Sequence, residues 1–169
     1  MKIVYIGVTK LSVRKFLEYV ITWVLLIAGI IIGCPLKLNY GNIFLTISGY
    51  LIFMVGMYIH YLSHKTHPKA HKDITEIDYI ATAGIYSWVR HPGYLGLILA
   101  FIGLALAFGS IPGPIISVIL SLYHYYLACK EEDMMIQKFG DAYIRYMNEV
   151  PDKLIPIKKV LRKRKSRES

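Results

Sequence analysis

The residues best suited to chemistry lie in two polar clusters about forty residues apart. Arg90 and His91 directly precede an apolar run, with Tyr86 and Tyr94 on either side of them, and the second cluster begins at Glu131. These groups supply a cation, a carboxylate and aromatic rings, which suit a ligand that carries an acid, an amine and a flat ring. The sequence therefore predicts a binding site, provided that the fold brings the two clusters together.

The segments around these clusters are long and free of charge, which predicts a membrane protein. The chain has 169 residues, of which 55% are hydrophobic, and a mean hydropathy of +0.44, too apolar for a soluble domain of this size. Charge-free runs of this length are typical of transmembrane helices. We expect an all-α, polytopic membrane fold with about four spans, at about 16–33, 43–62, 94–109 and 112–129. A C-terminal amphipathic helix over 130–147 is expected to lie at the cytoplasmic membrane surface.

Helix breakers and small residues set the limits and the packing of these spans. The sequence Gly33-Cys34-Pro35 should end the first span, and the Gly- and Pro-rich stretch 109–114 should fold the apolar run 91–129 into a helical hairpin. Gly49 and Gly56 stand a heptad apart in the second span, where they would let a neighbouring helix approach closely. The hairpin would bring the start of the third span beside the end of the fourth. The amphipathic helix could bend at Gly140.

The net charge of +9 comes mainly from Lys and Arg at the start of the chain, in the loop 63–90 and in the C-terminal region with its basic tail, 158–169. The positive-inside rule places all three on the cytoplasmic side, so both termini are expected there. The tail is expected to touch anionic lipid. Nucleic acid is not expected as a partner, because no aromatic platform is interleaved with the basic residues.

The motif around the first cluster resembles a known family. Residues 82–96 read TAGIYSWVRHPGYLG, and they are followed by Glu131-Glu132, Phe139-Gly140 and Val150-Pro151. This pattern is similar to that of the isoprenylcysteine carboxyl methyltransferases and, more broadly, of the membrane phospholipid N-methyltransferases. The resemblance covers about 82–156. It implies one membrane methyltransferase domain over 1–157, S-adenosyl-L-methionine as the cofactor, and a lipidic acceptor that arrives from the bilayer.

The same resemblance implies roles for particular residues, with the cytoplasmic cofactor site at 78–94 and 130–147. Arg90 and Glu131 would be catalytic. Asp78 stands where the family usually has a His, which leaves only a backbone role nearby. No metal is expected, because a sulfonium is already a strong electrophile. Cofactor contacts would come from Ile80, Ala81, Tyr86, His91, Pro92, Gly93, Tyr94 and Glu131.

Two acceptors fit this pattern. The resemblance favours a prenylcysteine-type carboxylate, but Leu127 stands where those enzymes commonly carry an Arg that is proposed to hold the carboxylate. An uncharged residue there would suit a phospholipid amine, or a carboxylate held by Lys130 or Arg90. The sequence is also compatible with a sterol-type NADPH reductase, since those enzymes share a similar C-terminal pattern, and with a non-enzymatic membrane scaffold. The oligomeric state is not predicted.

A few further residues carry weaker expectations. Of Glu131 and Glu132, which point about 100° apart on a helix, one is expected to face solvent. His124 lies within a span, and we expect a neutral imidazole bonded to a neighbouring helix, with a functional role as the alternative. The histidines of the polar loop do not complete a standard metal-ligand set. No disulfide is expected between Cys34 and Cys129, which belong to opposite ends of different spans. The loop histidines are His64, His67 and His71.

Overall fold

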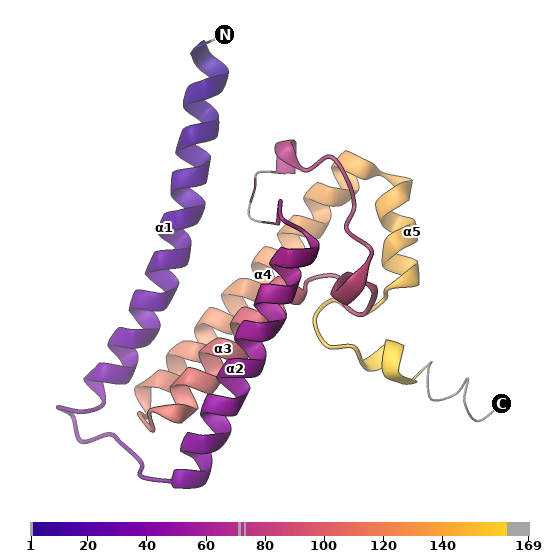
Figure 1. Cartoon of the computed structure of the whole chain (residues 1–169). Coiled ribbons are helices and arrows are strands. Elements are labelled where there is room, and N and C mark those ends of the chain that lie inside the picture. The colour runs from indigo at the N-terminus through magenta and orange to yellow at the C-terminus, as the bar shows by residue number, and fades with distance from the viewer. Residues whose placement is uncertain (1, 71, 73, 162–169) are drawn as a thin grey trace.

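The computed structural model describes the backbone of residues 2–70, 72 and 74–161, and the side chains of this set from residue 17 onward. Over this part the chain is all-helical, with helices α2, α3 and α4 side by side, α1 diverging from them towards the N-terminus, and α5 folded back at the end of α4 (Figure 1). Two short 3-10 helices, η1 and η2, lie in the connection between α2 and α3. The bounds are α1 Lys2–Ile32, α2 Ile43–Thr66, η1 Ile74–Glu76, η2 Gly84–Ser87, α3 Pro92–Ala107, α4 Pro112–Phe139 and α5 Asp141–Glu149.

The four predicted helices are confirmed, but several of their limits differ from the prediction. Helix α2 extends to Thr66 instead of 62, and α3 spans Pro92–Ala107 instead of 94–109. The two largest differences are at the start of α1 and the end of α4. Helix α1 begins at Lys2 instead of near residue 16, so its polar lead is helical as well. Helix α4 continues through Cys129 to Phe139, because residues 130–139 favour helix and contain no breaker. The prediction of a separate amphipathic helix over 130–147 is therefore wrong for residues 130–139, which belong to α4. Gly140, with φ of +53°, ends α4, and only α5 forms a distinct helix beyond it.

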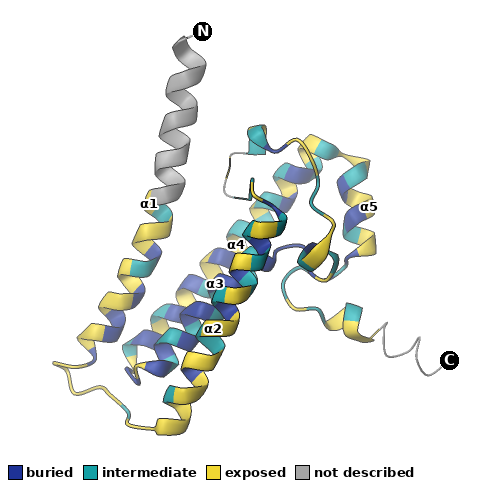
Figure 2. Ribbon diagram, in the orientation of Figure 1, coloured by how far each residue is buried: buried dark blue, intermediate teal, exposed yellow. Residues whose placement is uncertain are grey.

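Exposed residues lie along the outer faces of the helices (Figure 2), and many of them are large and apolar. Within the described residues, one helix, α2, is long and apolar enough to cross a bilayer, and two shorter apolar helices span Leu17–Ile32 and Pro92–Ala107. A soluble protein rarely exposes large contiguous apolar surface. These features support membrane localisation.

Helices α2 and α3 pack at backbone distance through glycines. A Cβ atom added to Gly56 would lie 2.6 Å from the Ala100 nitrogen, and one added to Gly96 would lie 2.6 Å from the Gly56 carbonyl oxygen. Gly49 and Gly103 repeat this close contact one heptad further along. The expected role of Gly49 and Gly56 is confirmed, and the close packing sets the distance between the end of α2 and the start of α3.

The second half of α1 packs on α3 and α4 around Phe101, which is fully buried and meets the Trp23 ring edge-on at 5.2 Å. Gly109, with φ of +63°, turns the chain between α3 and α4 at the predicted break. The Ile111 amide donates to the Leu38 carbonyl over 2.9 Å, which fixes this turn against the connection between α1 and α2. The hairpin thus brings the start of α3 beside the charged part of α4.

Candidate active site

The two polar clusters meet at the carboxylate of Glu132. The Arg90 Nε donates to Glu132 Oε1 over 2.7 Å, and the His91 Nε2 lies 3.2 Å from the same oxygen. The Lys153 ammonium lies 2.9 Å from Glu132 Oε2. Burial opposes ionisation of Glu132, but the hydrogen bonds from His91, Arg90 and Lys153 outweigh it and lower the pKa to about 2. Glu132 is therefore a buried anion at neutral pH.

The segment that follows α5 lies along Arg90 and His91. The Arg90 Nη1 donates to the Val150 carbonyl over 2.7 Å, and the Arg90 amide donates to the Asp152 carbonyl over 3.0 Å. The His91 amide donates to the Lys153 carbonyl over 3.0 Å. These bonds satisfy the backbone donors that precede α3, which the helix itself leaves without a partner. The segment 150–153 therefore holds the motif in place from outside.

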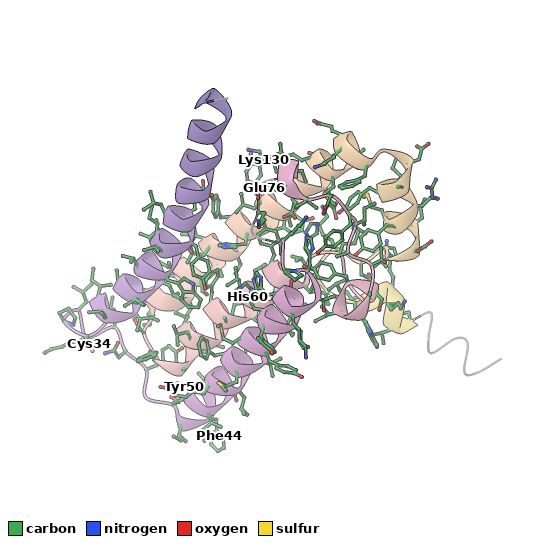
Figure 3. The ribbon with its side chains drawn as sticks, turned by 45° about the horizontal axis from the view of Figure 1, so that its top comes forward. Cys34, Phe44, Tyr50, His60, Glu76 and Lys130 are labelled. Carbon is green, nitrogen blue, oxygen red and sulfur yellow. The ribbon has the colours of Figure 1, made fainter. Side chains whose placement is uncertain are left out.

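A cavity opens beside this cluster, with about 700 Å³ of empty space including its mouth. Its walls come from the end of α2, the connection 67–81, η2, the start of α3, the charged part of α4, and α5. Glu76 and Lys130 mark the end of the molecule that holds it, whereas Cys34 and Phe44 lie at the other end (Figure 3). Of the predicted site residues, Ile80, Ala81, Tyr86, Arg90, His91, Gly93, Tyr94 and Glu131 line the cavity.

Pro92 is the predicted cofactor residue that is absent from this wall. It is fully buried and occupies the first position of α3, where its missing N–H and fixed φ favour helix initiation. In the structure Pro92 therefore begins α3, and its two neighbours, His91 and Gly93, line the cavity.

Tyrosines form the aromatic part of the wall. The Tyr86 hydroxyl lies 2.7 Å from Ser63 Oγ, and the Tyr146 hydroxyl donates to the Tyr86 carbonyl over 2.8 Å. Burial raises the pKa of Tyr86 to about 12, and its bond to Ser63 offsets only part of this effect. Burial also raises the pKa of Tyr143 and Tyr146. These rings are therefore neutral, and they can serve as flat surfaces for an apolar or aromatic ligand.

The connection between α2 and α3 closes over the cavity. The Lys138 ammonium donates to the carbonyls of Ile74 and Thr75, over 2.6 and 3.0 Å. Asp78 forms an ion pair of 2.7 Å with Lys69 and is exposed, so its side chain points away from the cavity. These contacts leave the segment at Ile80 and Ala81 against the cavity.

Glu131 and Arg90 both line the cavity, but their surroundings differ. Glu131 is half-buried in the wall and raises the pKa of Tyr86. Arg90 is the one Lys or Arg among the described lining residues, and its guanidinium is engaged by Glu132 and Val150. The expectation that one of the paired glutamates faces solvent is wrong, because Glu132 is buried and Glu131 faces the cavity. The site therefore offers a ligand a carboxylate, an imidazole and aromatic rings.

Several residues of the site were not predicted. Glu132 carries the central ion pair, and Lys153 completes it. His60, at the end of α2, lies in the cavity wall with its neighbour His64. The signal that could have identified this pair is its spacing, since residues i and i+4 share one face of a helix.

The remaining histidines and the cysteines lie outside the central ion pair. His124 is buried, and its Nδ1 donates to the carbonyl of Leu120 on its own helix over 2.8 Å, instead of to a neighbouring helix as expected. His67 lines the cavity, and His71 lies outside the described residues. No group of three potential metal ligands occurs within the described part of the chain. Both cysteines are free.

Comparison with known proteins identifies the family. A family model for phospholipid methyltransferases matches residues 44–142, which is more than half of the chain and includes the end of α2, the motif and the paired glutamates. The chain therefore belongs to the phospholipid methyltransferase family. The resemblance indicated by the motif is confirmed.

Curated relatives carry a more specific name, protein-S-isoprenylcysteine O-methyltransferase. The one from Schizosaccharomyces pombe is 32% identical over 90 residues, which cover 53% of this chain and 36% of that protein. The one from Saccharomyces cerevisiae is 32% identical over 112 residues, covering 62% and 46%, and the one from Homo sapiens is 33% identical over 85 residues, covering 48% and 29%. The chain thus spans less than half the length of these relatives.

Proposed function

We propose that this protein transfers a methyl group from S-adenosyl-L-methionine to a lipidic acceptor in the membrane. The observation that carries the proposal is the cavity into which His91, Tyr94 and Glu131 project from two segments about forty residues apart. Family membership supports methyl transfer. The names of the curated relatives support a prenylcysteine-type carboxylate as the acceptor.

The donor set of the cavity fits the cofactor. S-adenosylmethionine carries an ammonium, a carboxylate, a sulfonium and a flat adenine. Glu131 would hold the ammonium or the ribose hydroxyls, and His91, whose Nε2 is bonded to Glu132, would donate to the carboxylate from Nδ1 as an imidazolium. Tyr86 and Tyr94 would form the wall beside the adenine and the sulfonium, with the backbone at Ile80 and Ala81 completing the site, as the family resemblance implies. When bound, this cofactor supplies an electrophilic methyl group, so no metal is required.

The role of the protein in this reaction is mostly to position its ligands. Methyl transfer gains chiefly from holding the acceptor and the methyl carbon in line at short distance. Glu132 and the segment 150–153 fix Arg90 and His91, and we assign Arg90 to positioning because its guanidinium is already engaged by Glu132 and Val150. His91 and Glu131 would then contact the cofactor directly.

We also propose that α1, α2, α3 and the first part of α4 each span the bilayer, with both termini and the cavity on the cytoplasmic side. The distribution of Lys and Arg supports this orientation. Single cysteines placed at Pro68 and at Ile155, which are both exposed, should then be labelled only from the cytoplasmic side. Labelling of these two sites from opposite sides would exclude the topology and, with it, the shared site.

Ligand binding tests the proposed activity. Calorimetry on the purified protein in detergent should detect S-adenosylmethionine and its demethylated product, but not NADPH. His91→Ala and Glu131→Ala should each abolish cofactor binding, whereas Lys65→Gln, on the exposed face of α2, should leave it unchanged. Binding of NADPH alone would favour a reductase, and binding of neither ligand would favour a scaffold.

A phospholipid amine is the second candidate acceptor, and one position favours it. Leu127 lies one turn before Glu131 on α4, is half-buried and carries no charge. A carboxylate acceptor would lack the Arg that the prenylcysteine enzymes commonly place there. An ammonium group would avoid a repulsive charge at the same position.

A further inference from the structure

The chain beyond α5 forms a short helical turn, 157–161, with an exposed apolar face. Ile157, Val160 and Leu161 are spaced i, i+3 and i+4, so they share one face of the turn, and they are 58%, 50% and 59% exposed. Lys158, beside them, is exposed, and Lys159 is partly exposed. More cations follow in the sequence, at Arg162, Lys163, Arg164, Lys165 and Arg167. An apolar face flanked by Lys and Arg is typical of a segment that lies on a membrane surface.

The helical turn follows a residue that packs beside the end of α2. Pro156 lines an apolar groove together with Ile59 and Leu62 of α2. Tyr58 and Tyr61, on the same stretch of α2, are exposed, and tyrosines at the end of a span are typical of the membrane–water interface. Figure 1 shows the yellow segment running from α5 back alongside the bundle. In the proposed topology the helical turn is therefore at the level of the cytoplasmic lipid headgroups.

Asp152 connects the helical turn with the site. It is only 6% exposed, and its two carboxylate oxygens accept from the backbone amides of Lys158 and Lys159, over 3.0 and 2.7 Å. Its own backbone carbonyl accepts from the Arg90 amide over 3.0 Å. A buried carboxylate that lost its donors would be costly. The helical state of the turn and the position of Asp152 against Arg90 therefore depend on each other.

We propose that the helical turn docks on anionic lipid of the cytoplasmic leaflet, and that docking strengthens the contact of Asp152 with Arg90 and so raises the affinity for the cofactor. The effect on the cofactor rests on the proposed function, whereas the docking does not. A short helix is stabilised mainly by packing of its apolar face. That face is exposed here, so the acyl region of a bilayer supplies the burial and anionic headgroups supply the counter-charge.

The coupling acts through backbone contacts that are already described. Docking stabilises the helical turn, and the turn supplies both amide donors to the Asp152 carboxylate. The segment 150–153 then holds the amides of Arg90 and His91, and His91 is assigned to the cofactor. By linkage, the factor by which lipid raises cofactor affinity equals the factor by which cofactor strengthens docking.

Hydrogen–deuterium exchange of the full chain in nanodiscs tests the docking and the coupling without turnover. One set of nanodiscs contains phosphatidylcholine alone, and the other contains an equimolar mixture with phosphatidylserine. In the mixture we expect the amides of 158–161 to exchange about tenfold more slowly, because docking protects the helical turn. The amides of Arg90 and His91 should slow as well, since they donate to the segment that the turn holds in place.

A charge variant tests the docking surface. Each Lys near an anionic surface strengthens binding by about fivefold, so Lys158→Gln combined with Lys159→Gln should weaken docking by about 25-fold and lose most of the response to phosphatidylserine. These substitutions keep the backbone amides that donate to Asp152. The matched control is Lys65→Gln combined with Arg145→Gln, which removes two exposed positive charges on α2 and α5 and should keep the full response.

A second variant separates docking from coupling. Asp152→Asn keeps one acceptor oxygen and loses the other, so the helical turn should still respond to phosphatidylserine, whereas the Arg90 amide should no longer do so. Calorimetry should show that the wild type binds S-adenosylmethionine at least about fivefold more tightly in the mixture, the lower end of usual allosteric coupling. Asp152→Asn should bind it equally in both compositions.

Several results would overturn the inference. They are equal exchange of 158–161 in both lipid compositions, a full response in the variant that lacks both lysines, and a wild type in which the helical turn responds but the Arg90 amide does not. Equal affinity of the wild type for S-adenosylmethionine in both compositions would overturn it as well. Failure to bind S-adenosylmethionine in either composition would instead refute the proposed function, and exchange of 158–161 would still decide the docking.

Discussion

Replacing Glu132 by alanine tests whether the buried ion pair holds the two halves of the site together. The side chains of Arg90 and Glu132 are only 7% and 6% exposed, so the mutation would leave the guanidinium buried without its counter-ion. Removing one partner of such a pair destabilises a protein by about 3–5 kcal/mol. Lys153 is 23% exposed and can turn towards water, so its share is small. For a chain of this size the loss corresponds to a decrease in Tm of roughly 6–20 °C.

Thermal unfolding in detergent, followed by circular dichroism, measures this loss. The matched control is Glu131→Ala, one residue away on the same helix, which should change the stability by less than about 1 kcal/mol because its side chain is only half-buried. In a second arm, Arg90→Met combined with Glu132→Leu should recover most of the stability, since replacing both ions by apolar groups is often neutral. If Glu132→Ala is as stable as Glu131→Ala, the buried pair does not hold the site together and the reasoning is wrong.

Three further predictions concern acid stability, helix packing and acceptor choice. Glu132 has a pKa of about 2 in the folded protein, below its ordinary value of 4.5. Its ionised form therefore stabilises the protein fully above about pH 4.5, and this stabilisation is lost as the pH falls towards 2. The free energy of unfolding, measured as a function of pH, should show this loss in the wild type and not in Glu132→Gln. Gly56→Ala should lower the Tm, because overpacking against Ala100 costs about 1–3 kcal/mol and the gain in helix propensity is at most about 1 kcal/mol. The control is Gly41→Ala, which should be neutral because a Cβ atom there would have nothing within 4 Å. Leu127→Arg should shift methylation from amine lipids towards a farnesylcysteine analogue without changing cofactor affinity, as measured with radiolabelled cofactor; an unchanged ratio of the two products would refute the role assigned to this position.

The positions of the helices could be predicted because length, apolarity and breakers determine them together. The end of α4 could not be found in this way. Hydropathy marks where a helix leaves an apolar environment, near Cys129, whereas backbone hydrogen bonding continues until a residue interrupts it, at Gly140. The start of α1 was missed for the same reason, since the segment before the apolar run contains no proline, and its one glycine, Gly7, does not interrupt the helix.

The site was predictable only in part. The motif indicated which side chains should gather, and His91, Tyr94 and Glu131 do line one cavity. It assigned Glu131 to the cofactor but did not predict that Glu132 is buried in an ion pair with Arg90, because the direction of a side chain is undefined until the neighbouring helices are placed. The hydrogen bond from Arg90 to the Val150 carbonyl could not be predicted either, because every residue has a backbone carbonyl and the sequence does not mark the one that accepts.

The glycines connect the packing of the helices with the geometry of the site. A Cβ atom on Gly93 would lie 3.1 Å from Ser63 Oγ, the atom that meets the Tyr86 hydroxyl. A Cβ atom on Gly96 would press on His60, whose ring reaches the Gly93 carbonyl. Larger residues at either glycine would therefore push α2 away from α3 and separate the histidine pair from the start of α3. The close approach of these helices is thus a requirement of the cavity wall as much as of the fold.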